Sequence, residues 1–371
     1  MSIRKPKALK YLQVYSALTR DIRSGRWSVG DQLPSEAELI STFGVSRITV
    51  SRAMRDLQAD GLVERRAGAG TFIKRPSGSG VYSFGLLIPD LGETDIFDPI
   101  CNGMMMSPLA RQHALIWGNT SGAGSSKVDR AWHLCGEYIE RRVSGVFFAP
   151  LELEPTRGEV NRKITDALDA AHIPVVLLDR SFVPIEESDQ HDLVGIDNRR
   201  AGYIITNHLL DVGCKRILFV GLPNAASTVD DRICGYRDAL YSREVPFDRA
   251  FVCRIDPTDE AGVKGIMEAH NPDGIACAND RTAGRLMQTL IRQGYRVPRD
   301  VRLVGIDDVE YASLLPVPLT TLRQPTRQIG DAAVEMMLER IARPDLPPRD
   351  TRLHCELIIR ESCGASISRF K

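Results

Sequence analysis

Charged and amide side chains follow several short apolar runs in the later part of this sequence. Carboxylate and amide oxygens accept hydrogen bonds from hydroxyl groups, and the planar fork of Arg donates them. A crevice that gathers such side chains beside an aromatic wall would suit a neutral ligand rich in hydroxyl groups, because buried polar groups left unpaired are costly. The residues of this kind are Asp90, Asp179-Arg180, Asn279-Asp280 and Asp307-Asp308.

The apolar runs themselves indicate the elements that must position these side chains. Each run is short and is separated from the next by an amphipathic stretch, a pattern that predicts buried parallel strands in βα units. Ligands of open α/β sheets bind beyond the carboxyl ends of the strands, which is where the polar residues lie. The runs are 84–88, 145–149, 175–178, 217–220, 274–278 and 301–306.

The first 75 residues have a different pattern, in which helical periodicity is followed by a glycine-containing ribbon. Ser35 and Glu38 fit a capping box that begins one helix. A turn around Gly44 leads to a further helix, which Ser46 caps and on which residues 50, 53, 54 and 57 form an apolar stripe. Arg47 lies in its first turn, and residues 62–73 predict a β-hairpin. Two helices joined by a short turn, with Arg at the start of the second, form an arrangement that reads the major groove of DNA.

The distribution of charge agrees with this division of the chain. The net charge is zero, with 48 basic and 48 acidic residues. Residues 1–75 carry 14 Lys and Arg against 7 Asp and Glu, whereas the rest of the chain carries 34 against 41. A basic head on an acidic body favours a head that meets a polyanion. A solvated basic face without a partner would give the same asymmetry, so charge alone leaves both interpretations open.

Length and composition exclude several classes of protein. A chain of 371 residues predicts two or three domains, and 43% hydrophobic with 26% charged residues is ordinary for a globular protein. We expect neither a membrane span nor a secretory signal. The eight cysteines are scattered without a C-x-x-C pair, so we expect buried thiols in the reducing cytoplasm and no metal site. No P-loop, nucleophile elbow or H-E-x-x-H motif occurs, and we expect no enzyme and no cofactor.

Motifs in the head resemble the GntR family of winged-helix transcription factors. They are GDQLPSE at 30–36, GVSRITV at 44–50, GLV at 61–63 and GAGTFI at 68–73. The resemblance covers about residues 8 to 75. Many family members carry Arg where this chain has Ala37, so a contact made from that position is not expected here. The family's DNA-contacting positions fall on Ser35, Glu36, Ser46, Arg47, Thr49, Arg52 and Gly68.

Motifs in the body resemble the superfamily of the lactose repressor and the periplasmic ribose-binding proteins. They are IPVVLLDR at 173–180, VGIDN at 194–198, RICGY at 232–236, AND at 278–280, VPRDV at 297–301, VGIDD at 304–308 and LTTLRQP at 319–325. The resemblance implies two Rossmann-like lobes with parallel sheets, joined by three crossings, and a ligand between them. The implied ligand positions are Asp179, Arg180, Arg232, Asn279, Asp307 and Gln324, with Asp90, Phe97 and Asp98 from the first loop.

Together these features predict an α/β protein, with an N-terminal winged helix-turn-helix followed by a two-lobed periplasmic-binding-protein-like domain, an arabinose-repressor-like architecture. We expect the DNA-binding domain at 1–75, a flexible linker at 76–82 and an effector-binding and dimerisation domain at 83–371. Within the last, lobe I is expected at about 83–193 plus 325–350 and lobe II at about 194–324 plus 351–365.

The two resemblances imply a ligand-responsive transcriptional repressor of carbohydrate metabolism genes. Its partners would be a small-molecule effector, expected to be a sugar, and palindromic double-stranded operator DNA bound by a homodimer. Three alternatives stay open at this point. The effector could be a non-sugar or phosphorylated metabolite, the body could serve only dimerisation, or Asp307 and Asp308 could act as a catalytic carboxylate pair on a sugar, although neighbours on a strand end point in different directions.

Overall fold

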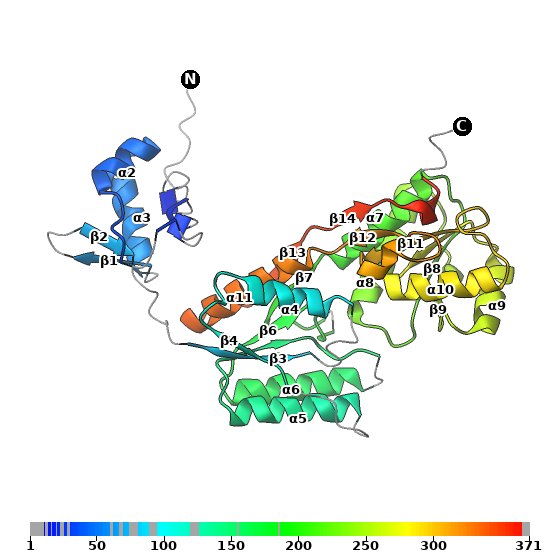
Figure 1. Ribbon diagram of the computed structural model, residues 1–371, viewed down its shortest axis with the longest axis horizontal. Coiled ribbons are helices and arrows are strands. Elements are labelled where there is room, and N and C mark those ends of the chain that lie inside the picture. The colour runs from blue at the N-terminus through cyan, green and yellow to red at the C-terminus, as the bar shows by residue number, and fades with distance from the viewer. Residues whose placement is uncertain are drawn as a thin grey trace. The chain divides into compact units, whose positions relative to one another are not determined.

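The computed structural model forms two compact units, Met1–Val81 and Tyr82–Lys371 (Figure 1). Most of the expected linker, residues 76–80, lies outside the residues that the structure describes. The described residues are 11, 14–15, 17–19, 21–22, 26–27, 30–59, 62–66, 70–73, 81–88, 95–118, 126–153, 156–184 and 186–365.

The first unit contains the helix-turn-helix and hairpin that the sequence predicts. Helix α2 (Glu36–Phe43) begins at the Ser35 capping box and ends at Gly44, which adopts the left-handed conformation that favours glycine. Helix α3 (Arg47–Ala59) follows after a short turn, and strands β1 (Val63–Arg66) and β2 (Gly70–Ile73) pair antiparallel. The predicted stripe on α3 is fully buried. It packs against Val14 and Leu18, which belong to a further helical stretch among the described residues 11–22.

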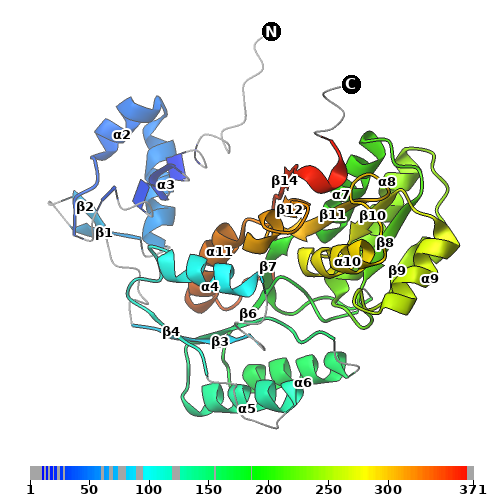
Figure 2. The same cartoon turned by 45° about the vertical axis from the view of Figure 1, so that its right-hand side comes forward.

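The second unit has two lobes, each built on a six-stranded sheet. In lobe I the strand order is β13-β7-β6-β5-β3-β4, and all neighbouring strands are parallel. Helices α5 and α6 cover one face of this sheet, and α4 and α11 cover the other (Figures 1 and 2). The strands are β3 (Ser83–Leu87), β4 (Ala114–Ile116), β5 (Gly145–Phe148), β6 (Val175–Leu178), β7 (Asp192–Ile196) and β13 (Asp350–Leu353), and the helices are α4 (Phe97–Met106), α5 (Lys127–Glu140), α6 (Arg157–Ala170) and α11 (Thr326–Ala342).

Lobe II repeats this architecture with the order β14-β12-β11-β10-β8-β9, in which only β14 runs antiparallel to its neighbour. Its strands are β8 (Ile217–Gly221), β9 (Val252–Arg254), β10 (Gly274–Cys277), β11 (Arg302–Asp307), β12 (Thr320–Arg323) and β14 (Glu356–Ile358). Its helices are α7 (Asn198–Asp211), α8 (Ser227–Ser242), α9 (Glu260–His270) and α10 (Asp280–Arg292), with short 3₁₀ turns at Arg249–Phe251, Glu310–Ser313 and Glu361–Cys363.

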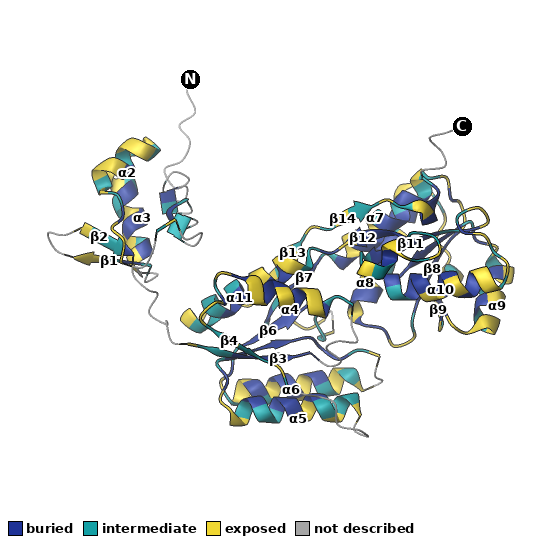
Figure 3. Cartoon of the chain, in the orientation of Figure 1, coloured by how far each residue is buried: buried dark blue, intermediate teal, exposed yellow. Residues whose placement is uncertain are grey.

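Along each strand, successive side chains point to opposite faces of the sheet, and this alternation gives the sheet a hydrophobic core on each face. In lobe I, Phe147 and Leu178 face α4 and α11, whereas their neighbours Phe148 and Leu177 face α5 and α6. All these side chains are buried, as the dark interior of Figure 3 shows. The six predicted runs therefore form β3, β5, β6, β8, β10 and β11. The other six strands, β4, β7, β9, β12, β13 and β14, were not among the predicted runs.

The chain crosses three times between the lobes, between β7 and α7, between β12 and α11, and between β13 and β14. The second crossing falls where the sequence places it. The first and third fall about three residues later than expected, because β7 pairs with β6 and β13 pairs with β7, which puts 194–196 and 351–353 in lobe I. Within the described part of the chain, no helix is both long and apolar enough to cross a lipid bilayer.

Candidate functional site

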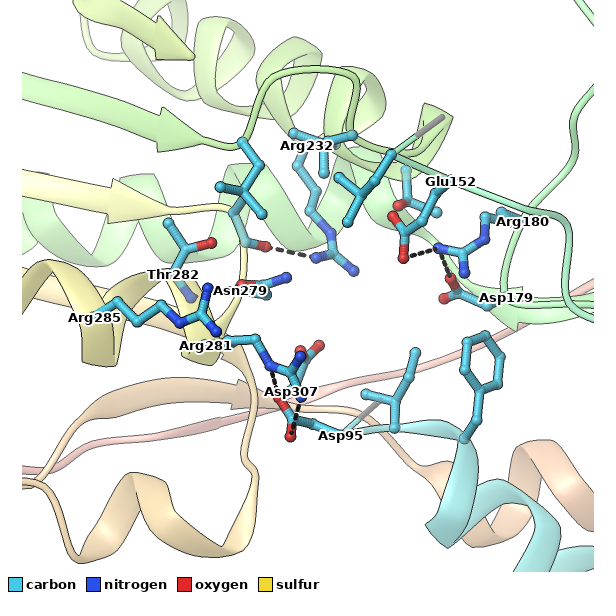
Figure 4. A pocket seen from close by; sticks show the side chains of 18 of the residues that line it. Asp95, Glu152, Asp179, Arg180, Arg232, Asn279, Arg281, Thr282, Arg285 and Asp307 are labelled. Carbon is cyan, nitrogen blue, oxygen red and sulfur yellow. Dashed lines mark hydrogen bonds and ion pairs between the residues drawn. The ribbon is translucent and has the colours of Figure 1, made fainter. Parts of the chain in front are cut away.

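A cavity of about 270 Å³ lies between the two lobes, at the carboxyl ends of their parallel strands. Lobe I contributes residues that follow β6 and begin α4, and lobe II contributes residues that follow β10 and β11 and lie on α8 and α10 (Figure 4). Six of the nine predicted ligand residues line this cavity: Phe97, Asp179, Arg180, Arg232, Asn279 and Asp307.

On the lobe I side, the buried guanidinium of Arg180 joins two carboxylates. Its Nη1 lies 3.1 Å from Glu152 Oε1 and 3.4 Å from Asp179 Oδ2, and its Nε donates to the Pro150 carbonyl at 3.0 Å. The guanidinium also lies over the ring of Phe97, 5.5 Å from the ring centroid. These contacts fix Arg180 and leave the other oxygen of Asp179, Oδ1, buried without a hydrogen-bond partner. Burial raises the pKa of Asp179, although Arg180 and Arg232 oppose this.

On the lobe II side, Arg232 extends from α8 toward the cavity (Figure 4). Its Nε donates to Asn198 Oδ1 at 2.9 Å and its Nη1 donates to the Ala278 carbonyl at 2.6 Å, so the guanidinium is held from two directions. Asn279, at the end of β10, accepts from the Thr282 amide at 2.9 Å and caps α10. Arg232 is therefore a preorganised donor, whereas the oxygen of Asn279 is already engaged by its own helix.

Asp307 ends β11 and accepts a hydrogen bond from Gln324 Nε2 at 2.8 Å. The pKa of Asp307 is raised to about 7. Removal of the carboxyl from bulk water is the largest cause and Asp179 and Asp95 act in the same direction, while Arg232 and Gln324 lower the pKa. The oxygen of the Gln324 amide is buried without a partner. This oxygen and Asp179 Oδ1 are costly to leave unpaired, and two ligand hydroxyls, one donating to each, would satisfy them.

The backbone at these carboxylates adopts conformations that L-residues rarely take. Asp179 has φ 69°, Asp307 has φ 127° and Asp308 has φ 56°. Such values cost about 1–3 kcal/mol each and persist where the surrounding structure enforces them, typically at functional sites. Here they turn the side chains at two strand ends toward the same space (Figure 4).

Of the three remaining predicted ligand residues, two line a neighbouring cavity and one is not described by the structure. Asp98 and Gln324 line a neighbouring cavity of about 510 Å³, which shares Asp95, Ile96 and Asp307 with the first. Asp90 falls outside the described residues. Gln324 donates a hydrogen bond to Asp307, which lines both cavities. Asp98 is exposed and does not line the main cavity.

Several residues that line the main cavity were not predicted from the sequence. Asp95 of lobe I accepts from Arg281 of lobe II at 3.1 and 3.2 Å and from the hydroxyl of Tyr311 at 2.9 Å, so it bridges the lobes. Opposite this bridge, Ser227 donates to the Ser181 carbonyl at 2.8 Å. The other residues that the prediction missed are Ile96, Lys127, Glu152, Leu153, Leu222, Ala225, Thr228, Val229, Ala278, Thr282 and Arg285. Three of these residues carried a signal in the sequence: Ala278 ends a predicted apolar run, and Arg281 and Thr282 follow the predicted Asn279-Asp280 strand end.

Asp308 does not form a carboxylate pair with Asp307. Arg323 Nε and Arg360 Nη2 each donate to Asp308 at 2.6 Å, on its two different oxygens. Its charge is therefore matched within lobe II. Among the described residues, no group of three or more His, Cys, Asp or Glu side chains is arranged to hold a metal ion.

In the first unit, the predicted DNA-contacting residues lie around the start of α2 and along α3. Ser46, Arg47 and Arg52 are exposed. Ser46 Oγ and Thr49 Oγ1 are 2.9 Å apart and hydrogen-bonded to each other. The guanidinium of Arg52 lies over the ring of Tyr11, 4.3 Å from its centroid.

The two predicted residues at the start of α2 are engaged within the unit. Ser35 closes the capping box with Glu38, and Glu36 forms an ion pair with Arg65 of the hairpin. This pair neutralises a carboxylate that would otherwise repel phosphates. Gly68 is outside the described residues. The binding roles of all these residues stay predictions.

The fold and the site together define the class of protein: a winged helix-turn-helix unit joined to a two-lobed domain with a polar cavity between the lobes. Residues 10–73 match the family of bacterial regulatory proteins called gntR, and residues 206–363 match the periplasmic binding protein-like domain. The chain therefore combines a GntR-type DNA-binding domain with a periplasmic-binding-protein-like domain, and the predicted architecture and fold class are confirmed.

Individual relatives match all or part of this chain. The arabinose metabolism transcriptional repressor of Geobacillus stearothermophilus is 27% identical over 96% of this chain and 99% of its own length. The ribose operon repressor of Haemophilus influenzae is 29% identical over 52% of this chain and 58% of its own length. Among solved structures, a CelR transcriptional regulator in complex with cellobiose superposes with a TM-score of 0.64 at 22% identity, covering 96% of this chain and 100% of the other. A LacI-family regulator of Enterococcus faecium with bound ribose gives a TM-score of 0.60 at 22% identity, over 76% and 98% of the two chains.

Proposed function

We propose that this protein is a transcriptional repressor whose affinity for operator DNA changes when a sugar binds between the two lobes of its second domain. One observation carries the proposal: side chains from both lobes, held in place by other protein groups, surround one cavity. Asp179 of this cavity has a buried acceptor oxygen without a partner, and so has Gln324, which is hydrogen-bonded to the cavity residue Asp307. A hydroxyl-rich ligand supplies the donors that these oxygens lack.

The named relatives support this ligand class. Repressors of arabinose and ribose genes, and regulators solved with ribose and cellobiose, match this chain in sequence or fold. A sugar binding better to the closed than to the open arrangement of the lobes would shift the equilibrium between them by its differential affinity. Since one recognition helix reads few base pairs, we further propose that a homodimer binds a palindromic operator in the cytoplasm.

The test uses the full chain and a duplex selected by it from a random pool. Neutral pentoses and hexoses and their phosphates are screened by thermal shift, and each sugar that raises the melting temperature is then added to the protein–DNA complex. At least one should shift operator affinity by tenfold or more, and operator binding should weaken steeply with added salt because phosphate contacts release counterions. A panel without any thermal shift would favour a body that serves only dimerisation.

Matched variants separate the two activities. Arg232→Met removes a hydrogen-bond donor in the cavity. It should abolish the sugar-induced rise in melting temperature while operator binding persists. Arg237→Met on the same helix, where the side chain is exposed, is the control and should change neither. Arg47→Ala should abolish specific DNA binding while the sugar-induced rise in melting temperature persists. Unchanged operator affinity would remove Arg47 from the DNA site.

A further inference from the structure

One apolar side chain lies at the place where the DNA-binding unit presents its polar residues. Ile48, in the first turn of α3, is 76% exposed, beside the exposed Arg47. It lies outside the buried stripe of α3, which begins at Val50. Among the described residues 30–73, no other large hydrophobic side chain is exposed to this degree.

The folding of the unit does not explain this residue. An exposed side chain contributes little to a core, and a β-branched residue is a poorer helix former than Ala, Lys or Glu at a solvent-facing position. Single exposed hydrophobic residues are common on protein surfaces. This one, however, occupies the N-terminal turn of the second helix of a helix-turn-helix, which is the turn that contacts base edges.

The chemistry of the major groove gives Ile48 a partner. Thymine presents a C5-methyl group there, and this group is recognised by apolar contact, whereas the other base-edge groups donate or accept hydrogen bonds. The flanking side chains Ser46, Arg47 and Thr49 are polar, and the Ser46 and Thr49 hydroxyls bond to each other. Ile48 is thus an exposed aliphatic side chain in a turn whose other exposed groups are hydrogen-bonding or charged.

We propose that Ile48 contacts the C5-methyl group of one thymine in each operator half-site and selects thymine over cytosine at that position. This proposal rests on the proposed function, because it requires α3 to enter the major groove. It adds a specificity-determining residue to the positions that the family resemblance implies.

The test removes the methyl group from the DNA instead of from the protein. An operator duplex is selected by the full chain, and each thymidine is then replaced, one at a time, by deoxyuridine, which differs only by the C5-methyl. Losing one buried methyl group should weaken binding about fourfold, since each is worth about 0.8 kcal/mol. We expect that loss at one symmetric position per half-site with the wild-type protein, measured by fluorescence anisotropy.

The variant Ile48→Ala should bind the thymidine and deoxyuridine duplexes equally at that position, and Ile48→Val should restore most of the discrimination. Ile359→Ala, which shortens an exposed Ile in the second unit, is the control and should behave as wild type. Wild-type protein indifferent to every replacement would overturn the proposal, and so would full methyl discrimination by Ile48→Ala, which would assign the contact to another group such as the Thr49 methyl. If no duplex is selected at all, it is the proposed function that fails.

Discussion

Replacing Asp307 by Asn should change how the stability of the protein depends on pH. Asn keeps the shape of the side chain and an oxygen that accepts from Gln324, but it cannot ionise. The carboxyl of Asp307 has a pKa of about 7, against an ordinary value of 3.8. Below about pH 3 the group is protonated in both the folded and the unfolded chain, so its ionisation favours neither state.

As pH rises, the unfolded chain ionises first, and stability falls until the folded-state pKa is passed. The free energy of unfolding lost in this way is about 2 kcal/mol at pH 5 and about 4 kcal/mol at pH 8. The substitution Asp307→Asn removes that loss. The groups that face Asp307 remain in both proteins: Asp179, Asp95 and Arg232. Asp280, whose pKa is raised by its own burial and then by Asp307, ionises more easily in the variant and adds to the gain.

The assay is urea unfolding of the full chain between pH 5 and pH 8, followed by tryptophan fluorescence. Relative to wild type, Asp307→Asn should gain about 2 kcal/mol between these two pH values. The control is Asp300→Asn. The pKa of Asp300 is lowered to about 2 by its hydrogen bonds to Arg296, so this carboxyl stays ionised throughout the range and its removal should leave the shape of the pH profile unchanged. Parallel profiles for wild type and Asp307→Asn would refute the reasoning, because they would mean that the Asp307 carboxyl is as well solvated as in the unfolded chain.

Two further substitutions test the contact between the lobes and the packing of two helices within lobe II. Asp95→Asn weakens the ion pair with Arg281 that bridges the lobes, and this partly exposed pair contributes about 1 kcal/mol. Amide hydrogen exchange at the starts of α4 and α10 should therefore become about fivefold faster in the ligand-free protein. Equal exchange rates in the two proteins would show that the ion pair does not hold the lobes together. Gly235→Ala places a methyl group against the Arg199 carbonyl, where α8 crosses α7, and should lower the free energy of unfolding by about 1–3 kcal/mol. Its control is Gly158→Ala on α6, where nothing lies near the added methyl group, and equal effects of the two would argue against close packing of α7 on α8.

The sequence by itself determined the features that depend on local patterns. The capping box at Ser35, the buried stripe on α3 and the six apolar runs each occupy neighbouring positions, and each predicts its element without knowledge of distant residues. Asn279 and Asp307 follow parallel strands of one sheet, so the pattern also predicted that these two come together, whereas the family resemblance implied that Asp179, on the other sheet, joins them.

Tertiary structure decided what depends on pairs distant in the sequence. Asp95 meets Arg281 across 186 positions, and Glu152 reaches Arg180 from another loop, so no local pattern marks either pair. The first and third crossings lie about three residues from the approximate bounds expected, because a strand's lobe is decided by its neighbour in the sheet. The raised pKa of Asp307 likewise arises from exclusion of water and from the carboxylates of Asp179 and Asp95 in the other lobe. Hydrophobic periodicity and helix capping involve residues that are close in the sequence. Strand pairing, ion pairing and the desolvation of ionisable groups depend on residues that are distant in the sequence, so only the folded chain determines them.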